Sequence, residues 1–486
     1  MIRRTKIVVT LGPATDKPGV MEALLLAGVN VVRLNFSHGT REDHKKRANE
    51  IRSLADKHGL TVAILGDLQG PKIRIARFSQ GSVVLGANNI FFLDVSLDSG
   101  AGDHNQVGVD YLELPNDISI GDRLLLDDGR LVLEVLAISG PRIKTKVIVG
   151  GRLYNNKGIN REGGGLSAAA LTDKDYQDIS LAADIGIDYL AVSFVRSCKD
   201  IQLARQLLNK EKCNAALVAK IERAEAVGDY ELLDQIILAS DAVMVARGDL
   251  GVEIGDAELI AIQKHIIKRA RQLNRCVITA TQMMESMIQN PLPTRAEVFD
   301  VANAVLDGTD AVMLSGETAA GKYPLEAVQA MIRVIVGAEG DPKISRSQHR
   351  LHEDFKKIDE SVAMAAMYTA NHLSGVKAII SLTETGNTPL LMTRISSGLP
   401  VVAFTRHQCT ANRVALYRGV IPTMFAPEGL SAKEVNRLIL QHLLSQNVVD
   451  NKDLVIISRG DYTEVCGGTN TLKIISVEGE MDELAL

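Results

Sequence analysis

The sequence predicts an α/β protein: a (β/α)8 TIM barrel with an inserted β-rich lid domain and a C-terminal α/β open-sheet domain. Eight short apolar runs, rich in β-branched residues, end in polar side chains and alternate with amphipathic helical stretches. Between the third and the fourth run, short strands and tight turns replace this alternation. After the eighth run the α/β alternation restarts. Together these observations define the fold class.

The barrel strands are predicted where apolar residues run almost without interruption, as in parallel strands that helices cover on both faces. The predicted strands are residues 6–12, 31–36, 62–67, 189–194, 217–222, 243–247, 276–281 and 311–315. The helix after the last strand is predicted to begin at Pro324, which suits a first turn, and to end at Gly340. An open doubly wound sheet is the alternative that this pattern leaves open.

Two changes of pattern predict the domain boundaries. We expect residues 1–70 and 172–343 to form the catalytic barrel, residues 71–171 a β-barrel-like lid, and residues 344–486 a C-terminal α/β regulatory domain. Gly70-Pro71 and Gly163-Gly164-Gly165 bound the lid, and such glycine-rich hinges would let it close over the barrel mouth. The C-terminal strands are expected in an open parallel sheet, at residues 378–380, 401–404, 454–457 and 474–477.

The composition excludes several classes of protein. Hydrophobic residues make up 46% and charged residues 23%, as in an ordinary globular chain. A net charge of −5 argues against nucleic-acid and anionic-membrane partners. No apolar run approaches the ~18 residues of a membrane span, and no signal peptide is recognisable. The scattered cysteines predict reduced thiols in a cytoplasmic protein; they are Cys198, Cys213, Cys276, Cys409 and Cys466.

Polar side chains follow most of the predicted barrel strands. The carboxyl ends of barrel strands converge on one face, and polar residues there are most often catalytic. We therefore expect one site at this face. It would be formed by Arg33, Asn35, Ser37, Asp67, Lys220, Glu222, Arg247, Asp249, Thr281, Ser315 and Glu317.

Glu222 and Asp249 follow neighbouring predicted strands, which favours a magnesium site. Mg²⁺ is usually held by one or two carboxylates, with water and substrate oxygens in the other positions. The alternative is that each carboxylate forms an ion pair with the adjacent arginine, Arg223 or Arg247. Lys220 strengthens the metal interpretation, because residues two apart on a strand share a face.

A lysine beside a metal suits a transferring phosphoryl group, whose charge spreads over its oxygens. The alternative for Lys220 is a Schiff-base lysine, which requires a lowered pKa. The neighbouring carboxylate of Glu222 opposes such lowering, so the sequence favours the phosphoryl role.

Two other patterns have simpler explanations. Residues 316–323 nearly match a P-loop, but Tyr323 stands where the Ser/Thr hydroxyl would be, so we interpret them as a barrel loop. Met283, Met284 and Met287 are expected to pack in the core.

Seven stretches together resemble the pyruvate kinase family. They are TLGPA at 10–14, VRLNFSHG at 32–39, AKIE at 219–222, MVARGDLG at 244–251, ATQM at 280–283, PTRAE at 293–297 and MLSGET at 313–318. The resemblance covers essentially the whole chain. It implies the last step of glycolysis, in which phosphoenolpyruvate and ADP give pyruvate and ATP. It also implies Mg²⁺ as the cofactor, with Mn²⁺ able to substitute, and a cytoplasmic homotetramer.

The resemblance assigns roles at the barrel mouth. Glu222 and Asp249 would hold Mg²⁺, Lys220 would stabilise the phosphoryl group in flight, and Arg33 would contact that group. Gly248 and Asp249 would receive the substrate carboxylate. The proton relay to the enolate would include Thr281, Ser315 and Glu317, and the nucleotide contacts would be Asn35, His38, Arg74 and Lys157. Without the resemblance, His38 is more simply explained as a histidine with satisfied hydrogen bonds.

One departure from the family pattern concerns potassium. Relatives that require K⁺ carry a glutamate where this chain has Lys72, and a tethered ammonium would supply the charge of the bound ion. Asn35, Ser37 and Asp67 match the K⁺ ligands, but Leu68 replaces a threonine. The resemblance therefore implies an activity that does not require K⁺.

The C-terminal region contains a loop similar to the family's effector site. Hydroxyls and amides there could surround a phosphate, and the candidate residues are Thr383, Thr385, Gly386, Asn387 and Thr388. Glu384 places a negative charge where some relatives carry lysine. A sugar monophosphate or AMP is therefore expected to activate better than fructose 1,6-bisphosphate. A structural loop without a ligand is the alternative.

Two rival functions use the same residues. A Mg²⁺-dependent, aldolase-like lyase would share the metal site but would need neither lid nor nucleotide contact. An inactive metabolite-sensing module would keep only the C-terminal effector domain. Formation of ATP from phosphoenolpyruvate and ADP separates both from a kinase.

Overall fold

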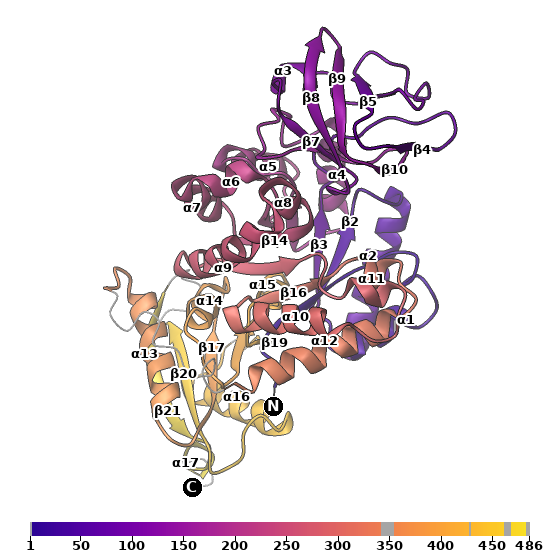
Figure 1. The fold of residues 1–486 in the computed structure, drawn as a ribbon. Coiled ribbons are helices and arrows are strands. Elements are labelled where there is room, and N and C mark those ends of the chain that lie inside the picture. The colour runs from indigo at the N-terminus through magenta and orange to yellow at the C-terminus, as the bar shows by residue number, and fades with distance from the viewer. Residues whose placement is uncertain (1, 342–353, 427–428, 461–467, 483–486) are drawn as a thin grey trace.

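The computed structural model describes residues 2–341, 354–426, 429–460 and 468–482. Figure 1 shows three parts along the molecule: small β-sheets at the top, a barrel in the middle and a second α/β unit at the bottom. The predicted boundary between residues 343 and 344, and Cys466, lie outside the described residues. The exact domain boundaries stay predictions.

Eight parallel strands of the described chain close a barrel in the order β1-β16-β15-β14-β13-β12-β3-β2. Each overlaps one predicted apolar run, so the predicted barrel is confirmed and the doubly wound alternative is wrong. The strands are β1 (Lys6–Thr10), β2 (Val31–Asn35), β3 (Ala63–Asp67), β12 (Tyr189–Val192), β13 (Ala216–Ile221), β14 (Ala242–Ala246), β15 (Cys276–Ala280) and β16 (Ala311–Leu314).

Alternation along the strands produces two cores. Val8 and Val31 belong to a cluster inside the barrel, whereas Ile7 and Val9 pack with the surrounding helices. All four side chains are almost completely buried. The strands are apolar on both faces for this reason, and only their ends are available to polar chemistry.

Capping residues define where several barrel helices begin. Thr40, Thr172 and Thr294 each form a capping box at the start of α2 (Arg41–His58), α4 (Asp173–Asp184) and α10 (Arg295–Asp307). As predicted, α12 (Pro324–Glu339) has proline in its first turn and Gly340 after its last residue. The other main barrel helices are α1 (Val20–Leu26), α5 (Cys198–Lys210), α7 (Tyr230–Ala239) and α9 (Asp256–Gln272).

The lid lies between β3 and β12 and has its own core, which includes Phe91, Leu133 and Ile143. Its six-stranded sheet has the order β11-β7-β8-β9-β5-β6, and β10 pairs with β4. Its elements are β4 (Ser82–Leu85), β5 (Ile90–Asp94), β6 (Gln106–Gly108), α3 (Leu114–Asp117), β7 (Arg123–Leu126), β8 (Leu131–Ser139), β9 (Arg142–Val149), β10 (Gly151–Tyr154) and β11 (Ile159–Arg161).

The C-terminal unit contains a five-stranded sheet, in the order β19-β18-β17-β20-β21. Its elements are α13 (Ile358–His372), β17 (Val376–Leu382), α14 (Asn387–Thr393), β18 (Val401–Thr405), α15 (Gln408–Val414), β19 (Val420–Met424), α16 (Ala432–Ser445), β20 (Leu454–Gly460), β21 (Thr469–Ser476) and α17 (Val477–Asp482). Two details differ from the prediction. The edge strand β19 was not predicted, and β21 pairs antiparallel with β20, so the sheet is not fully parallel.

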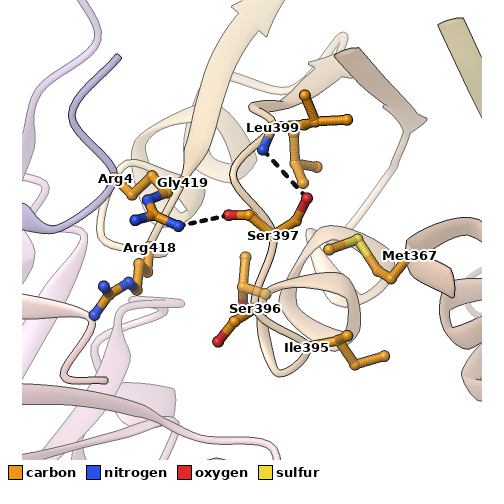
Figure 2. A pocket seen from close by; sticks show the side chains of 10 residues that line it. Arg4, Met367, Ile395, Ser396, Ser397, Leu399, Arg418 and Gly419 are labelled. Carbon is orange, nitrogen blue, oxygen red and sulfur yellow. Dashed lines mark hydrogen bonds between the residues drawn. The ribbon is translucent and has the colours of Figure 1, made fainter. Parts of the chain in front are cut away.

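Buried polar contacts join the C-terminal unit to the amino ends of the barrel strands. Arg394 pairs with Asp310, each with a side chain 1% exposed. Lys6 donates a 2.5 Å hydrogen bond to the carbonyl of Val420. A small cavity of about 20 Å³ lies at this junction. Figure 2 shows side chains that line it, with the 2.8 Å hydrogen bond from Arg4 to the Ser397 carbonyl. The cavity has room for roughly one water molecule and lies at the end of the barrel opposite the polar strand ends.

None of the helices in the described part of the chain is both long and apolar enough to cross a membrane.

Candidate active site

The carboxyl ends of the barrel strands bring the predicted polar residues to one face, as expected. Arg33 and Asn35 lie on β2, Asp67 is the last residue of β3, and Lys220 lies on β13 with Glu222 just after it. Others lie on short helices or turns that follow a strand. These are Asp249 on α8 (Arg247–Ile254), Thr281 after β15, Ser315 after β16 and Glu317 on α11 (Gly316–Ala319).

A buried chain of alternating charges forms the centre of this face. Nε of Arg33 donates to Oδ2 of Asp67 at 2.6 Å, and Nζ of Lys220 lies 3.3 Å from Oδ1 of the same carboxylate. Lys220 also lies 3.0 Å from Oε1 of Glu222 and donates to Oγ of Ser193 at 2.7 Å. Asp67 and Glu222 have side chains only 1% exposed. Such a chain is stable in the interior because every charge has a partner.

The charged side chains at the centre of this face shift one another's pKa values. Burial alone would raise the pKa of Asp67, but Lys220 and Arg33 lower it below its ordinary value. Burial would lower the pKa of Lys220, but Asp67 and Glu222 raise it instead. Lys220 therefore stays protonated, which removes the lowered pKa that a Schiff-base lysine needs.

Glu222 and Asp249 form the pair of carboxylates that could hold a divalent cation. Burial raises the pKa of Glu222, Lys220 opposes this, and the negative charge of Asp249 raises it further. Two carboxylates that repel each other in a buried site gain from a shared cation. No cluster of three or more His, Cys, Asp or Glu side chains suited to a metal occurs in the described residues. Mg²⁺ needs only one or two carboxylates and takes its other oxygens from water and substrate, so the pair of Glu222 and Asp249 fits this ion.

The arginines next to these carboxylates have other partners. Arg247 contacts both oxygens of Asp300 at 2.7 Å. Arg223 pairs with Glu225 at 3.0 Å and Glu253 at 3.4 Å. The alternative in which each carboxylate pairs with its neighbouring arginine is therefore wrong.

Lys72 joins the lid to Asp249. Its Nζ donates to Oδ1 of Asp249 at 2.9 Å and lies 4.0 Å from Asp128. Burial lowers the pKa of Lys72, but Asp249 more than compensates, so the pKa is raised. The site thus contains three cations (Arg33, Lys72 and Lys220) and three carboxylates (Asp67, Glu222 and Asp249).

The turn after β15 is strained in a way that places the Thr281 hydroxyl. Thr281 and Gln282 have φ values of 65° and 55°, in the left-handed region that a β-branched residue rarely adopts. Arg247 stabilises the turn by donating to the Thr281 carbonyl at 2.6 Å. As a result, Oγ1 of Thr281 accepts a 2.8 Å hydrogen bond from the backbone of Gly248, one residue before Asp249.

Ser315 and Glu317 lie together on the far side of the barrel mouth. Glu317 is 2% exposed, and its carboxylate accepts from the backbone N–H groups of Ser315 at 2.7 Å and Met284 at 3.1 Å. The Ser315 hydroxyl is buried and has no hydrogen-bond partner among the described residues. Residues 316–319 form only the one-turn helix α11, which confirms a barrel loop rather than a P-loop. Met283 and Met284 are fully buried, as predicted.

The predicted nucleotide residues lie in two parts of the chain, the lid and the end of β2 with the turn after it. Arg74 donates to the Asn156 carbonyl at 2.8 Å, and Lys157 pairs with Asp127 at 2.7 Å, so both belong to the lid. Asn35 accepts from the backbone N–H of Ser37 at 3.1 Å, and the exposed His38 follows in the same turn. A Cβ on Gly158 would lie 3.2 Å from the Lys72 side chain, so this part of the lid adjoins the charged site.

Comparisons with known proteins agree with this geometry. The model for "Pyruvate kinase, barrel domain" matches residues 2–328, and that for "Pyruvate kinase, alpha/beta domain" matches residues 360–475. The chain belongs to the pyruvate kinase family. It is 59% identical to "Pyruvate kinase II" of Salmonella typhimurium, over 98% of this chain and 99% of the relative. It is 57% identical to the pyruvate kinase of Haemophilus influenzae (96% and 98% covered) and 39% identical to that of Mycobacterium tuberculosis (99% and 100%).

The loop that resembles the family's effector site is held by an internal hydrogen bond and by contacts with neighbouring segments. The Thr383 hydroxyl accepts from the Gly386 backbone at 2.9 Å, and the Thr388 hydroxyl contacts that of Thr469 at 2.7 Å. Glu384 pairs with His407 at 2.6 Å and Arg406 at 3.2 Å. Its carboxylate thereby occupies the Arg406 guanidinium and the His407 imidazole, two groups that could otherwise contact a phosphate.

The sequence reasoning missed three residues that contact this pyruvate kinase site. Thr10 accepts from Arg33 at 3.0 Å, Ser193 accepts from Lys220, and Glu253 contacts Arg223 behind the site. Thr10 and Ser193 also lie at or just beyond the carboxyl end of a strand, so the same positional rule could have found them. Glu253 lies on a helix, and no local signal distinguishes it.

Proposed function

We propose that this chain catalyses the pyruvate kinase reaction, the Mg²⁺-dependent transfer of the phosphoryl group of phosphoenolpyruvate to ADP, giving pyruvate and ATP. The observation that carries this proposal is the largely buried set of three cations and three carboxylates at the barrel mouth. Phosphoryl transfer is catalysed mainly by positioning and electrostatic stabilisation, which is what such a set supplies.

Each side chain has a role in this proposal. Glu222 and Asp249 would hold Mg²⁺ or Mn²⁺, which when bound would neutralise phosphoryl oxygens and stabilise the enolate. Lys220, kept protonated by Asp67 and Glu222, stabilises the transferring group. Asp67 orients Arg33 toward the same group.

The substrate carboxylate and the enolate proton would be handled on the side of Thr281. The Gly248 and Asp249 backbone at the start of α8 would receive the substrate carboxylate. The Thr281 hydroxyl, fixed against Gly248, would orient the group that protonates the enolate. Ser315, supported by Glu317, would complete the proton relay, because its buried hydroxyl has hydrogen-bonding capacity to spare.

The nucleotide would lie between the lid and the barrel. Arg74 and Lys157 would approach its phosphates from the lid, and Asn35 and His38 from the turn after β2. Since Lys157 adjoins Gly158, which lies against Lys72, the nucleotide phosphates would be close to the metal site.

We also propose that turnover does not require K⁺. Of the residues that match the K⁺ ligands, Asp67 is already engaged by Arg33 and Lys220. Leu68, in place of a threonine, is buried and offers no side-chain ligand. The ammonium of Lys72 supplies a positive charge beside Asp249 instead.

Regulation through the C-terminal unit is a further part of the proposal. The activator would be a sugar monophosphate or AMP, because Glu384 adds a negative charge to the loop and already contacts the Arg406 and His407 side chains that a second phosphate would need. We propose that the protein acts as a homotetramer in the cytoplasm.

The test is a coupled assay of pyruvate and ATP formation. Glu222→Gln and Asp249→Asn are each expected to lower kcat/KM by at least about 100-fold, since each removes a charge from the metal site. Both should also weaken Mn²⁺ binding measured without substrate. Glu50→Gln, an exposed change on α2, is the control. Absence of ATP formation by the unmodified chain would favour the rival functions, and full activity in both variants would overturn the proposal.

A further inference from the structure

Glu253 is a buried carboxylate that the proposed chemistry does not use. It lies on α8, one turn after Asp249, and is 2% exposed. Burial raises its pKa to about 7, against the effect of Arg223, which lowers it. A carboxylate buried at such a cost needs partners that repay it. Its partners come from two other parts of the chain.

The carboxylate of Glu253 contacts the lid through Oε1 and the barrel through both oxygens. Oε1 accepts from the amide of Asn160 on β11 at 3.2 Å and lies 3.4 Å from Nε of Arg223. Oε2 accepts from the backbone N–H of Ala224 at 2.8 Å. The Glu253 carbonyl also accepts from the Gly163 backbone at 2.9 Å. Glu253 therefore connects α8, the β13 exit loop and the last strand of the lid.

Each connected segment carries a residue of the proposed site. Asp249 lies on the same helix as Glu253. Glu222 lies two residues before Ala224 in the β13 exit loop. Lys157 lies three residues before Asn160, in the turn of the lid that precedes β11. One carboxylate is thus within a few residues of both proposed metal ligands and of a proposed nucleotide contact.

The neighbouring residues of the exit loop reinforce this connection. Nη2 of Arg223 donates to the Leu166 carbonyl at 3.1 Å, and Glu225 accepts from the Gly165 backbone at 2.5 Å. A Cβ on Gly164 would lie 2.6 Å from Oε2 of Glu225, and Gly164 has φ of 78°. The positive φ of Gly164 favours glycine there, and the short distance shows that the lid hinge is packed directly against the loop that follows Glu222.

We propose that Glu253 is a positioning residue that, through Asn160, holds the lid at the distance where nucleotide phosphates meet the phosphoryl group of the substrate. This inference rests on the proposed function, because it takes Lys157 as a nucleotide contact. Glu253 touches neither substrate nor metal in this scheme. It acts by fixing β11 relative to α8. Its loss would therefore move the nucleotide contacts of the lid away from the part of the site that binds phosphoenolpyruvate.

The experiment compares Asn160→Ala, Asn160→Asp and the double variant Glu253→Gln/Asn160→Asp. Asn160→Ala removes one hydrogen bond and is expected to lower kcat/KM for ADP about 2- to 12-fold. Asn160→Asp places a second carboxylate against that of Glu253 and should lower kcat/KM for ADP further. In the double variant, the introduced glutamine can accept from Ala224 and donate to the introduced aspartate, so activity should recover toward that of Asn160→Ala or better. KM for phosphoenolpyruvate should change less than twofold throughout.

The matched control is Asp122→Asn. It weakens a 2.9 Å contact inside the lid, between Asp122 and Arg161, and Arg161 is the residue that follows Asn160. It should leave the ADP kinetics unchanged. The positioning role is overturned if KM values for both substrates rise equally, if the double variant is no better than Asn160→Asp, or if Asp122→Asn has the same effect. An unmodified chain that makes no ATP would overturn the proposed function as well. Normal turnover with unaffected variants would overturn only the role of Glu253.

Discussion

Replacing Lys72 with methionine tests whether a tethered ammonium substitutes for a potassium ion. Methionine keeps an unbranched apolar stem but removes the charge that lies 2.9 Å from Asp249. The site would then contain two cations against three carboxylates, all at least partly buried. We expect Lys72→Met to lose activity in K⁺-free buffer and to regain part of it when K⁺ is added.

The expected loss of activity in Lys72→Met follows from the strength of the contact between Lys72 and Asp249. At 2.9 Å and an effective dielectric constant near 20, the Coulomb attraction of the pair is about 6 kcal/mol before desolvation is subtracted. The side chains of Lys72 and Asp249 are 26% and 22% exposed, so water screens part of it. A charged hydrogen bond of this kind contributes about 1.5–3 kcal/mol net. We therefore expect kcat/KM to fall roughly 10- to 150-fold.

The assay is coupled pyruvate formation in K⁺-free and Na⁺-free buffer, with tetramethylammonium chloride keeping the ionic strength constant. The unmodified chain should turn over equally with and without K⁺, whereas Lys72→Met should respond to K⁺ but not to tetramethylammonium. Near-zero turnover of the unmodified chain, restored by K⁺, would refute the reasoning. So would a Lys72→Met variant that is fully active without K⁺.

Three further predictions concern other contacts. Thr10→Val removes an acceptor of Arg33 at 3.0 Å and should lower kcat/KM for phosphoenolpyruvate about tenfold, while Thr10→Ser stays active; equal activity of the two contradicts this. Asp310→Ala leaves Arg394 buried without its carboxylate and should lower the free energy of unfolding by about 3–5 kcal/mol in denaturant titrations; a loss below about 1 kcal/mol contradicts it. Burial lowers the pKa of Lys6 to about 7, while Arg3 lowers it further and Glu339 and Asp310 oppose this. Unfolding therefore takes up a proton between pH 7 and the ordinary lysine range, so the melting temperature should rise with pH there, and Lys6→Met should flatten this rise.

The barrel was predictable because its signal is local. Each barrel strand is a short apolar run covered on both faces. Polar side chains follow most of these runs at the carboxyl end of the strand, where the barrel opens to solvent. The edge strand β19 lacked this signal, because Pro422 interrupts its run and edge strands tolerate proline. The direction of β21 was also wrong. Only residues 461–468 separate it from β20, too few for the crossover that a parallel neighbour needs.

The candidate site was predictable only as a set of residue types. The sequence placed Lys220 and Glu222 on one face, because their spacing of two is local. It could not show that Asp67 lies between Arg33 and Lys220, because that depends on the barrel order in which β3 adjoins β2 and β12. Contacts such as Glu253 with Asn160 join residues far apart in sequence, so only the folded chain reveals them.

The charge balance of the site explains why its residues act together. Arg33, Lys72 and Lys220 balance Asp67, Glu222 and Asp249, so the protein part of the site is close to neutral. Phosphoenolpyruvate adds the charge of a phosphoryl group and a carboxylate, which a largely buried site tolerates poorly by itself. A divalent cation adds positive charge, and without the substrate this charge would also be unbalanced in the largely buried site. Substrate and metal would therefore stabilise each other's binding, and by linkage each would raise the affinity of the other by the same factor.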